Sequence, residues 1–342
     1  MILTQTTGLA DPLFKLFHHA DRLSGLRQGK FSAPIMVDID PVDGVCNLDC
    51  DWCCQAASRA SRPTRIMADE TMIRLGSFCQ AWGVKSWRIA GDSEPLLNKN
   101  ISLLIESGHA HAIDMGLITN GVYLDRLSKI DLQRLRWLGV SLDAASAETW
   151  SSLKHARQED FHRILENIRR ARSLAPELDI SIKFLRWNAE ESLSKSRFTV
   201  PIRKISGDGA LQPVLQGNNC NEEPEFRALA ERLGVHAILR DSYPKDFPSR
   251  YRFAKCVATP LGGVFDASHN FHLCCDARNV YVLTDDYTRD DWRELPALWG
   301  GDRHKEMIAS IQPGNCLGCA KYRMNEAIEK YIFADTPDHN FI

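Results

Sequence analysis

Ten residues, 45–54, constrain this chain more than any others, because they read VCNLDCDWCC directly after an apolar, strand-like run at 34–40. The segment places Cys46, Cys50 and Cys53 at C-x3-C-x2-C spacing. A tightly wound loop with this spacing can direct three thiols at one centre about 4 Å across, the size of a four-iron, four-sulfur cube. Three protein ligands would leave one iron open to a small molecule.

A structural zinc ion is the main alternative, because clustered thiols often hold zinc in a tetrahedral site. No fourth Cys or His lies at ordinary zinc-finger spacing unless the adjacent Cys54 is used. Two neighbouring thiols rarely bind one ion comfortably, so the spacing favours an iron–sulfur cluster over zinc.

The pattern Cys46-x3-Cys50-x-Trp52-Cys53 resembles the cluster loop of the radical S-adenosylmethionine (SAM) enzymes. In that family the open iron of a [4Fe–4S] cluster chelates the amino and carboxylate groups of SAM. One electron from the cluster then cleaves SAM into methionine and a 5′-deoxyadenosyl radical. The resemblance implies that Cys46, Cys50 and Cys53 hold this cluster and that Trp52 packs on the cluster loop near the adenine; the alternative for Trp52 is an ordinary core residue. It also implies a reductant such as flavodoxin or ferredoxin.

Composition narrows the class of protein. The 342 residues are 44% apolar and 25% charged, as in soluble globular proteins, and leave room for a large core plus a smaller unit. A net charge of −2 gives no general reason to expect nucleic acid or an anionic membrane as partner. No signal peptide or long apolar span is visible, so we expect a cytoplasmic protein. Eleven cysteines, mostly clustered, then indicate metal binding rather than disulfides.

From residue 34 onward, short apolar runs alternate with amphipathic stretches, which predicts βα units, a parallel sheet and ligands at the carboxyl ends of the strands. The strand count alone also describes a doubly wound sheet. The resemblance implies instead a fold of the α/β class, a partial (β/α)6 TIM-like barrel. The predicted strands are 34–40, 86–90, 113–118, 138–143, 179–185 and a weaker one at 201–205 or 211–215; the predicted helices lie near 69–82, 99–108, 125–137, 147–172 and 222–233.

Three domains are expected. Apolar residues at helical spacing over 11–29 predict a cap helix within an N-terminal segment, 1–33. The segment 240–256 is rich in Pro, Arg and aromatic residues and breaks the strand–helix alternation. We therefore expect the barrel to span 34–240 and a small auxiliary-cluster domain to span 241–342.

Polar residues follow several predicted strands. The segment 91–95, GDSEP, resembles the family's Gly-Gly-Glu-Pro segment, which binds the SAM amino group, with Glu94 as the acceptor; its Asp92-Ser93 departs from that pattern. The alternative is that these polar residues only form turns and cap the helices that follow. The resemblance implies SAM contacts for the following residues: Gly91, Asp92, Ser93, Glu94, Asn120, Ser141 and Asp143.

Two further residues are candidates for the same edge of the barrel. Lys183 and its neighbour Arg186, on an apolar strand, could reach the SAM carboxylate or an acidic substrate, and an inward lysine needs a partner. Cys220 lies in the polar loop 217–221 beyond the last candidate strand. Its thiol could return a hydrogen atom to a substrate radical, as an enzyme that inverts a stereocentre requires; the alternative is a loop cysteine without a role.

A second cysteine group lies towards the C-terminus. Residues 265–275 read as a β-hairpin with its turn at 268–270, and a C-x2-C turn and a helix at 321–333 follow. This arrangement resembles the SPASM or shorter twitch extensions of radical SAM enzymes, which bind auxiliary [4Fe–4S] clusters. Because no cysteine follows the C-x2-C pair, it implies one auxiliary cluster and two clusters in total; a zinc ribbon is the alternative. The implied ligands are Cys256, Cys274, Cys316 and Cys319, with Cys275 as the alternative to Cys274.

These features together predict a radical SAM enzyme that abstracts hydrogen from a substrate, leading to oxidation, epimerisation or another radical rearrangement. Only 33 residues precede the first predicted strand, too few for the peptide-binding module that peptide-modifying relatives commonly carry. We therefore expect a small-molecule substrate, such as a sugar, an aminocyclitol or a nucleoside-linked sugar. The alternatives are peptide maturation with a separate recognition protein and a non-catalytic, zinc- or cluster-binding regulator.

Overall fold

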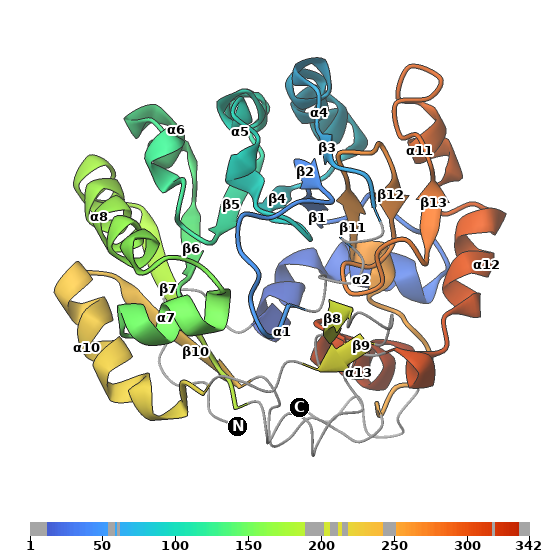
Figure 1. Ribbon diagram of the computed structural model, residues 1–342. Coiled ribbons are helices and arrows are strands. Elements are labelled where there is room, and N and C mark those ends of the chain that lie inside the picture. The colour runs from blue at the N-terminus through green and yellow to red at the C-terminus, as the bar shows by residue number, and fades with distance from the viewer. Residues whose placement is uncertain are drawn as a thin grey trace.

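The computed structural model describes residues 12–53, 59, 62–188, 202–205, 211–213, 218–241, 251–316 and 319–334. Their main feature is a nine-stranded sheet whose strands stand side by side in an arc (Figure 1). The strand order is β10-β7-β6-β5-β4-β1-β11-β12-β13. The barrel strands are β1 (Met36–Ile39), β4 (Ser86–Ile89), β5 (Asp114–Thr119), β6 (Trp137–Ser141), β7 (Asp179–Arg186) and β10 (His236–Asp241), and each pairs in parallel with its neighbour.

This arrangement confirms the α/β class and the partial barrel, with one correction. The sixth strand was expected at 201–205 or 211–215, and that prediction is wrong. There β8 (Ile202–Ile205) and β9 (Leu211–Pro213) pair antiparallel with each other, because the five residues between them are too few for a parallel crossover. The sixth barrel strand is β10, which the helix α10 (Glu223–Leu233) precedes and brings alongside β7.

The helices follow the predicted pattern closely. One predicted helix, 147–172, is divided because His155 adopts the left-handed conformation (φ 50°) and ends its first part. The N-terminal helical run also has a short 3₁₀ turn at Leu16–His19. The helices up to the middle of the chain are α1 (Pro12–Lys15), α2 (Ala20–Arg27), α4 (Asp69–Trp82), α5 (Ile101–Ala110), α6 (Lys129–Arg134), α7 (Ala147–Lys154) and α8 (Gln158–Leu174).

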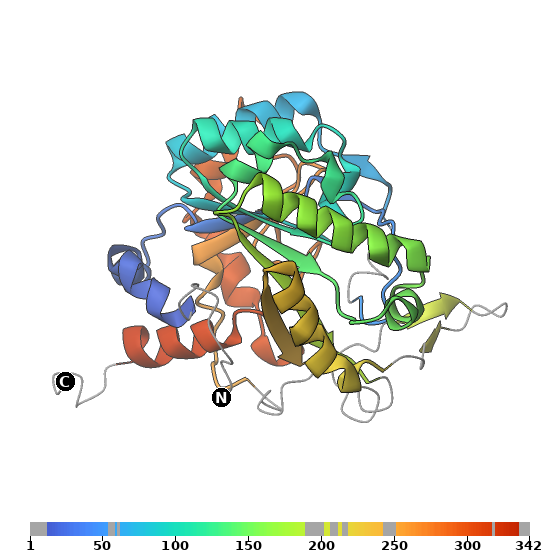
Figure 2. The same cartoon turned by 90° about the vertical axis from the view of Figure 1, so that its left-hand side faces the viewer.

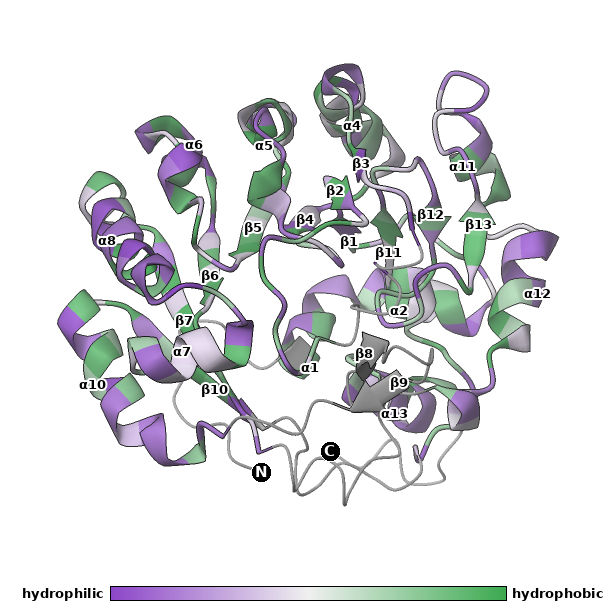
Figure 3. Ribbon diagram, viewed as in Figure 1, coloured by the Kyte–Doolittle hydropathy of each residue, from purple (hydrophilic) through white to green (hydrophobic). Residues whose placement is uncertain are grey.

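The two faces of the sheet differ in chemistry, because successive strand residues point to opposite faces. One face consists of fully buried apolar side chains, such as Ile39, Leu117 and Ile182, and the helices α4, α5, α6, α8 and α10 cover it (Figure 2). Burying each such side chain contributes about 1.5–3 kcal/mol. Figure 3 shows hydrophobic residues along β5 and β11 and many hydrophilic residues on α8. The opposite, inner face carries charged residues, including Asp38 and Arg88.

The sheet continues into the C-terminal third of the chain. β11 (Gly262–Phe265) pairs in parallel with β1, and β12 (Phe271–His272) and β13 (Val282–Thr284) follow antiparallel. The predicted hairpin turn is confirmed: the Asp266 carboxylate accepts hydrogen bonds from the backbone N–H groups of Ser268 and Asn270. The domain boundary expected between residues 240 and 241 lies at the end of β10 and stays a prediction. The remaining helices are α11 (Glu294–Leu298), α12 (Asp302–Ser310) and α13 (Tyr322–Ile328), which a π-helical turn at Glu329–Phe333 extends.

The N-terminal helix packs on this C-terminal third rather than on the outer helices. Leu23 and Leu26 of α2 form a small apolar cluster with Ala258, Leu261 and Ile328. Among the described helices, none combines the length and the apolar character that crossing a bilayer requires.

Candidate active site

The three cysteines of the first group lie in one loop beyond β1. A short antiparallel pair, β2 (Val42–Asp43) with β3 (Arg65–Ile66), frames the segment that contains them. Burial raises the pKa of Cys50 to about 11, and the neighbouring thiols of Cys53 and Cys46 add to the rise. The three half-buried thiols thus lie within electrostatic reach of one another. Cys54, which the zinc alternative required, lies outside the described residues.

The chemistry around these thiols suits a cluster. Among the described residues, no three His, Cys, Asp or Glu side chains converge closely enough to hold a single metal ion. Three soft thiolates are ligands that iron–sulfur clusters take, and two cations stand beside them. Arg59 donates hydrogen bonds to Cys53 Sγ (3.0 Å) and to the backbone oxygen of Asp92 (2.7 Å), and the Lys154 charge acts on Cys50. The donor set therefore fits a [4Fe–4S] cluster held by Cys46, Cys50 and Cys53.

Hydrogen bonds tie the cysteine loop to the ends of neighbouring strands. The backbone N–H of Val45 donates to Ser93 Oγ, which follows β4 (3.3 Å). The Asn120 amide, at the end of β5, donates to Asn47 Oδ1 (2.8 Å). Two of the residues predicted from the sequence, Ser93 and Asn120, are thereby placed next to the loop.

Glu94 is buried and its carboxylate already holds three donors. Oε1 accepts from the Leu96 N–H (3.1 Å) and the Thr119 hydroxyl (2.6 Å), and Oε2 accepts from the Asn120 N–H (2.8 Å). Burial raises its pKa, and these hydrogen bonds oppose the rise. Since a carboxylate offers about four lone-pair sites, one acceptor position on Oε2 remains for a ligand ammonium group.

Gly91 and Asp92 are positioned by the backbone and by an ion pair. Gly91 has φ +142°, and a Cβ there would lie 3.3 Å from Asp40 Cγ, so the position suits glycine. The Asp92 carboxylate accepts from Arg62 Nη1 (2.8 Å) and from Ser93 Oγ (2.8 Å). Arg62 also pairs with Asp266 (2.9 Å), so Asp92 belongs to a charge network that joins the turn to the C-terminal hairpin.

Lys154 connects several predicted residues, although the sequence did not single it out. Its ammonium lies 2.5 Å from Asp143 Oδ2, 3.3 Å from the backbone oxygen of Ser141 and 4.7 Å from the Trp52 ring. Burial opposes its charge, but Asp143 and then Cys50 raise its pKa. As the last residue of an amphipathic helix, Lys154 carries no sequence signal of burial.

Asp143 and Trp52 also make contacts with other parts of the protein. Asp143 adopts φ 64°, a conformation that Asp tolerates, and its Oδ1 accepts from the Leu185 N–H (2.8 Å). Trp52 packs against Trp187, with ring centroids 5.8 Å apart, and against Leu153. The expected position of Trp52 beside the cluster and near the adenine stays a prediction.

Cys220 lies at the same edge of the sheet. The side chain of its neighbour Asn219 donates to the backbone oxygens of Asp143 (2.7 Å) and Leu185 (2.8 Å), which fixes this loop to the ends of β6 and β7. The half-buried Cys220 thiol donates to the Trp187 backbone oxygen at 3.5 Å.

Comparison with known proteins agrees with this geometry. Residues 42–191 match the family model of the radical SAM superfamily. The protein carries a radical SAM domain. GTP 3′,8-cyclase of Ectopseudomonas mendocina is 25% identical over 253 residues, which cover 70% of this chain and 74% of that protein. GTP 3′,8-cyclase of Synechocystis is 29% identical over 125 residues, 36% of this chain and 37% of that protein.

The fold is also similar to a solved structure. Streptococcus suis SuiB, solved bound to the precursor peptide SuiA, superposes with a TM-score of 0.53 at 14% identity, covering 91% of this chain and 75% of that one. The similarity in fold therefore covers the radical SAM domain and most of the rest of this chain.

Four cysteines of the second group, which follows the radical SAM domain in the chain, act on one or both of two tyrosines and so lie near one another. Burial, and then the thiols of Cys319, Cys316 and Cys274 together with Asp276, raise the pKa of Tyr251. The pKa of Tyr281 is likewise raised by burial and then by the thiols of Cys316, Cys256 and Cys274. The buried Cys275 thiol is a neighbour of Arg88 and Arg278, and it also shares a hydrogen bond with the Cys274 thiol. Cys275, Cys274 and Cys256 all act on the charge of Lys321. Cys274 and Cys275 thus lie in the same neighbourhood, and Cys274 as the ligand of an auxiliary cluster, with Cys275 as its alternative, stays a prediction.

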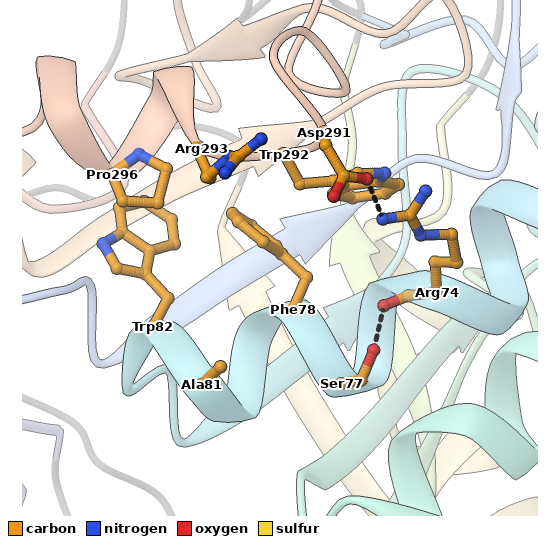
Figure 4. Close-up of a pocket in the computed structure, with 9 residues that line it drawn as sticks. All are labelled: Arg74, Ser77, Phe78, Ala81, Trp82, Asp291, Trp292, Arg293 and Pro296. Carbon is orange, nitrogen blue, oxygen red and sulfur yellow. Dashed lines mark hydrogen bonds and ion pairs between the residues drawn. The ribbon is translucent and has the colours of Figure 1, made fainter.

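Two hollows in the surface differ in their relation to the radical SAM domain. A hollow of about 360 Å³ lies on the cysteine loop and is lined by residues 44–49, Arg59 and His155. A larger one of about 550 Å³ lies between α4 and the segment 291–296, where Phe78, Trp82 and Trp292 form its aromatic wall (Figure 4). The larger hollow contains none of the residues predicted to bind SAM or a cluster.

Proposed function

We propose that this protein is a radical SAM enzyme that cleaves SAM reductively and abstracts hydrogen from a small-molecule substrate. The observation that carries the proposal is that Cys46, Cys50 and Cys53 lie within electrostatic reach of one another in a loop tied to the ends of β4 and β5. When bound, the cluster supplies the electron that converts SAM into methionine and a 5′-deoxyadenosyl radical.

The residues around the loop have distinct roles in this proposal. Glu94 accepts a hydrogen bond from the SAM ammonium with its remaining lone pair, and Gly91 lets the backbone approach the ligand. Arg59 and Lys154 compensate the negative charge of the thiolates. Asp92, Ser93, Asn120, Ser141 and Asp143 hold the surrounding backbone and side chains in place through the hydrogen bonds described above.

A small molecule remains the favoured substrate class, and two observations support it. The inner face of the sheet carries many charged side chains, which suit a polar ligand. Two relatives of this chain, the GTP 3′,8-cyclases, are named for GTP, a small phosphorylated molecule. A sugar, an aminocyclitol or a nucleoside-linked sugar fits both observations. We further propose one auxiliary [4Fe–4S] cluster held by Cys256, Cys274, Cys316 and Cys319, and flavodoxin or ferredoxin as the electron donor.

Anaerobic incubation with SAM, a reductant and candidate metabolites tests the proposal, with 5′-deoxyadenosine and product read by mass spectrometry. We expect a brown protein that forms 5′-deoxyadenosine, and a triple variant, Cys46→Ala/Cys50→Ala/Cys53→Ala, that forms none and has lost about half of its iron. A colourless, zinc-containing protein without SAM cleavage would contradict the enzyme assignment. Product formation only with a peptide would move the substrate class to peptide maturation.

The net reaction depends on whether a hydrogen donor is present, and Cys220 is the candidate. Its loop is fixed to the ends of β6 and β7, at the edge where the cysteine loop also lies. If its thiol donates a hydrogen atom, the remaining thiyl radical is restored to the thiol by one electron from flavodoxin or ferredoxin and one proton. Turnover in deuterated water then places one deuterium at the reacting carbon, and Cys220→Ala stops product while 5′-deoxyadenosine still forms. Normal product from that variant would favour oxidation through the auxiliary cluster.

A further inference from the structure

The charged residues on the inner face of the sheet fall into two groups. The first group is paired: Arg88 donates to both carboxylate oxygens of Asp38 (2.8 and 2.5 Å), and Arg278 does so to Asp40 (2.6 and 3.0 Å). These pairs lie on and beside β1 and satisfy their own charges.

Lys183 and Arg240 form the second group. Lys183 lies on β7 opposite Ile238, and Arg240 lies on β10 opposite Leu185, so the two cations are two positions apart on the same face of neighbouring strands. Among the described residues, neither side chain makes a hydrogen bond or an ion pair. Burial lowers the pKa of Lys183 to about 7, and the charges of Arg240 and then Arg88 add to this effect. The protein thus holds two cations together at an electrostatic cost.

The surface beside Lys183 is shaped by glycine and an aromatic ring. A Cβ at Gly139 would lie 2.8 Å from Lys183 Cε, so the lysine stem lies across a position without a side chain. Its ammonium stands 5.9 Å from the Trp137 ring, and that ring in turn covers Gly116. Glycine is required at position 116, because a Cβ there would overlap the Trp137 ring, and this ring provides an aromatic surface next to Lys183.

The position of Lys183 relates it to the radical SAM site. Lys183 pairs in register with Ser141, two residues before Asp143. Lys154, the other buried lysine of this region, lies 2.5 Å from the Asp143 carboxylate and is already neutralised. Lys183 and Arg240, which have no hydrogen-bond or ion-pair partner in the described part of the chain, thus lie on the inner face, close to the edge where SAM is proposed to bind.

We propose that Lys183 and Arg240 together bind an anionic group, a phosphate or a carboxylate, of the small-molecule substrate. A lysine and an arginine held side by side suit an oxyanion, because each can form charge-assisted hydrogen bonds with it. The anion would offset the mutual repulsion of the two cations, and Trp137 would contact the uncharged part of the ligand. This inference rests on the proposed function, since it names the substrate class of that enzyme.

Binding of simple anions to the reconstituted, SAM-loaded protein tests the inference without requiring turnover. Pyrophosphate serves as the phosphate probe and citrate as the carboxylate probe, each measured by isothermal titration calorimetry at constant ionic strength. The variants are Lys183→Met and Arg240→Gln. Arg136→Gln is the matched control, because Arg136 lies on the exposed surface and pairs there with Asp114 (2.7 Å). SAM affinity and iron content are measured for every variant.

We expect wild-type protein and Arg136→Gln to bind at least one probe, and each of the other variants to bind it about tenfold or more weakly. The preferred probe then identifies the group as phosphate or carboxylate. Failure of both probes to bind the wild type, or equal affinity in the variants, would overturn the inference. A comparable loss of SAM affinity in Lys183→Met would also overturn it and assign this lysine to the SAM carboxylate. Failure of SAM cleavage, in contrast, would count against the proposed function. The anion titrations could still be interpreted, because they do not require turnover.

Discussion

The ammonium of Lys154 lies 2.5 Å from the carboxylate of Asp143, and both side chains are buried next to the cysteine loop. The pair joins α7 to the end of β6. The backbone oxygen of Lys154 also accepts from the Asp49 N–H (3.0 Å), so the end of α7 supports the loop directly. A substitution that removes the charge of one partner leaves the charge of the other buried and unpaired beside the thiols.

We therefore expect Lys154→Met to lower the free energy of unfolding by about 3–5 kcal/mol, as is usual when one partner of a buried ion pair is removed. Asp143→Asn is the matched change, because Asn tolerates the positive φ at this position. Urea denaturation of the two single variants and the double variant measures the coupling. The double variant should be less destabilised than the sum of the two, and strict additivity would show that the pair contributes little.

Glu94→Ala should weaken SAM binding about ten- to a hundredfold while the cluster remains, because a charge-assisted hydrogen bond to the SAM ammonium is lost. It should also destabilise the protein, since three donors lose their acceptor. Thr119→Val is the control, because it removes only one of these hydrogen bonds. If both variants weaken SAM binding equally in a titration, Glu94 only shapes the turn.

The ligand assignment in the second cysteine group predicts different outcomes for two adjacent residues. Cys274→Ala should lose up to half of the iron after anaerobic reconstitution, because one cluster loses a ligand. Cys275→Ala should keep its full iron content, since Cys275 is buried towards Arg88 and Arg278. Iron analysis of the two variants decides the assignment, and the reverse result would make Cys275 the ligand.

Anion binding at Lys183 should depend on pH. Because the pKa of Lys183 is lowered to about 7, its ammonium loses its proton as the pH rises through this value. An anion prefers the protonated form, so affinity should fall as the pH rises from about 6 to about 8. The charged groups that act on Lys183 are Arg240 and Arg88, whose guanidinium groups stay protonated in this range, and Asp143, which is paired with Lys154.

Sulfate is a suitable probe for this measurement, because it remains a dianion over the whole pH range. Calorimetric titration at several pH values should give a declining affinity for the wild type and a flatter profile for Lys183→Met. Identical profiles for the two proteins would show that another group is responsible.

Local patterns in the sequence determined much of this protein. The spacing of Cys46, Cys50 and Cys53 depends on a single loop, and five of the six barrel strands have apolar runs long enough to be recognised from their own residues. Arg88 was not a candidate, but like Lys183 it is a cation within an apolar strand, so the same pattern could have identified it. These features could be predicted because each depends on residues that are close together in the chain.

The tertiary structure decided the features that depend on which distant residues meet. The sixth strand is β10 rather than a strand at 201–215, because the crossover through α10 places it beside β7. Lys154 meets Asp143 because α7 returns to the end of β6, and Lys183 meets Arg240 because the register of β7 and β10 places them on one face. Sequence patterns specify the face of a strand or helix on which a charge lies, whereas packing and register determine whether that charge finds a partner.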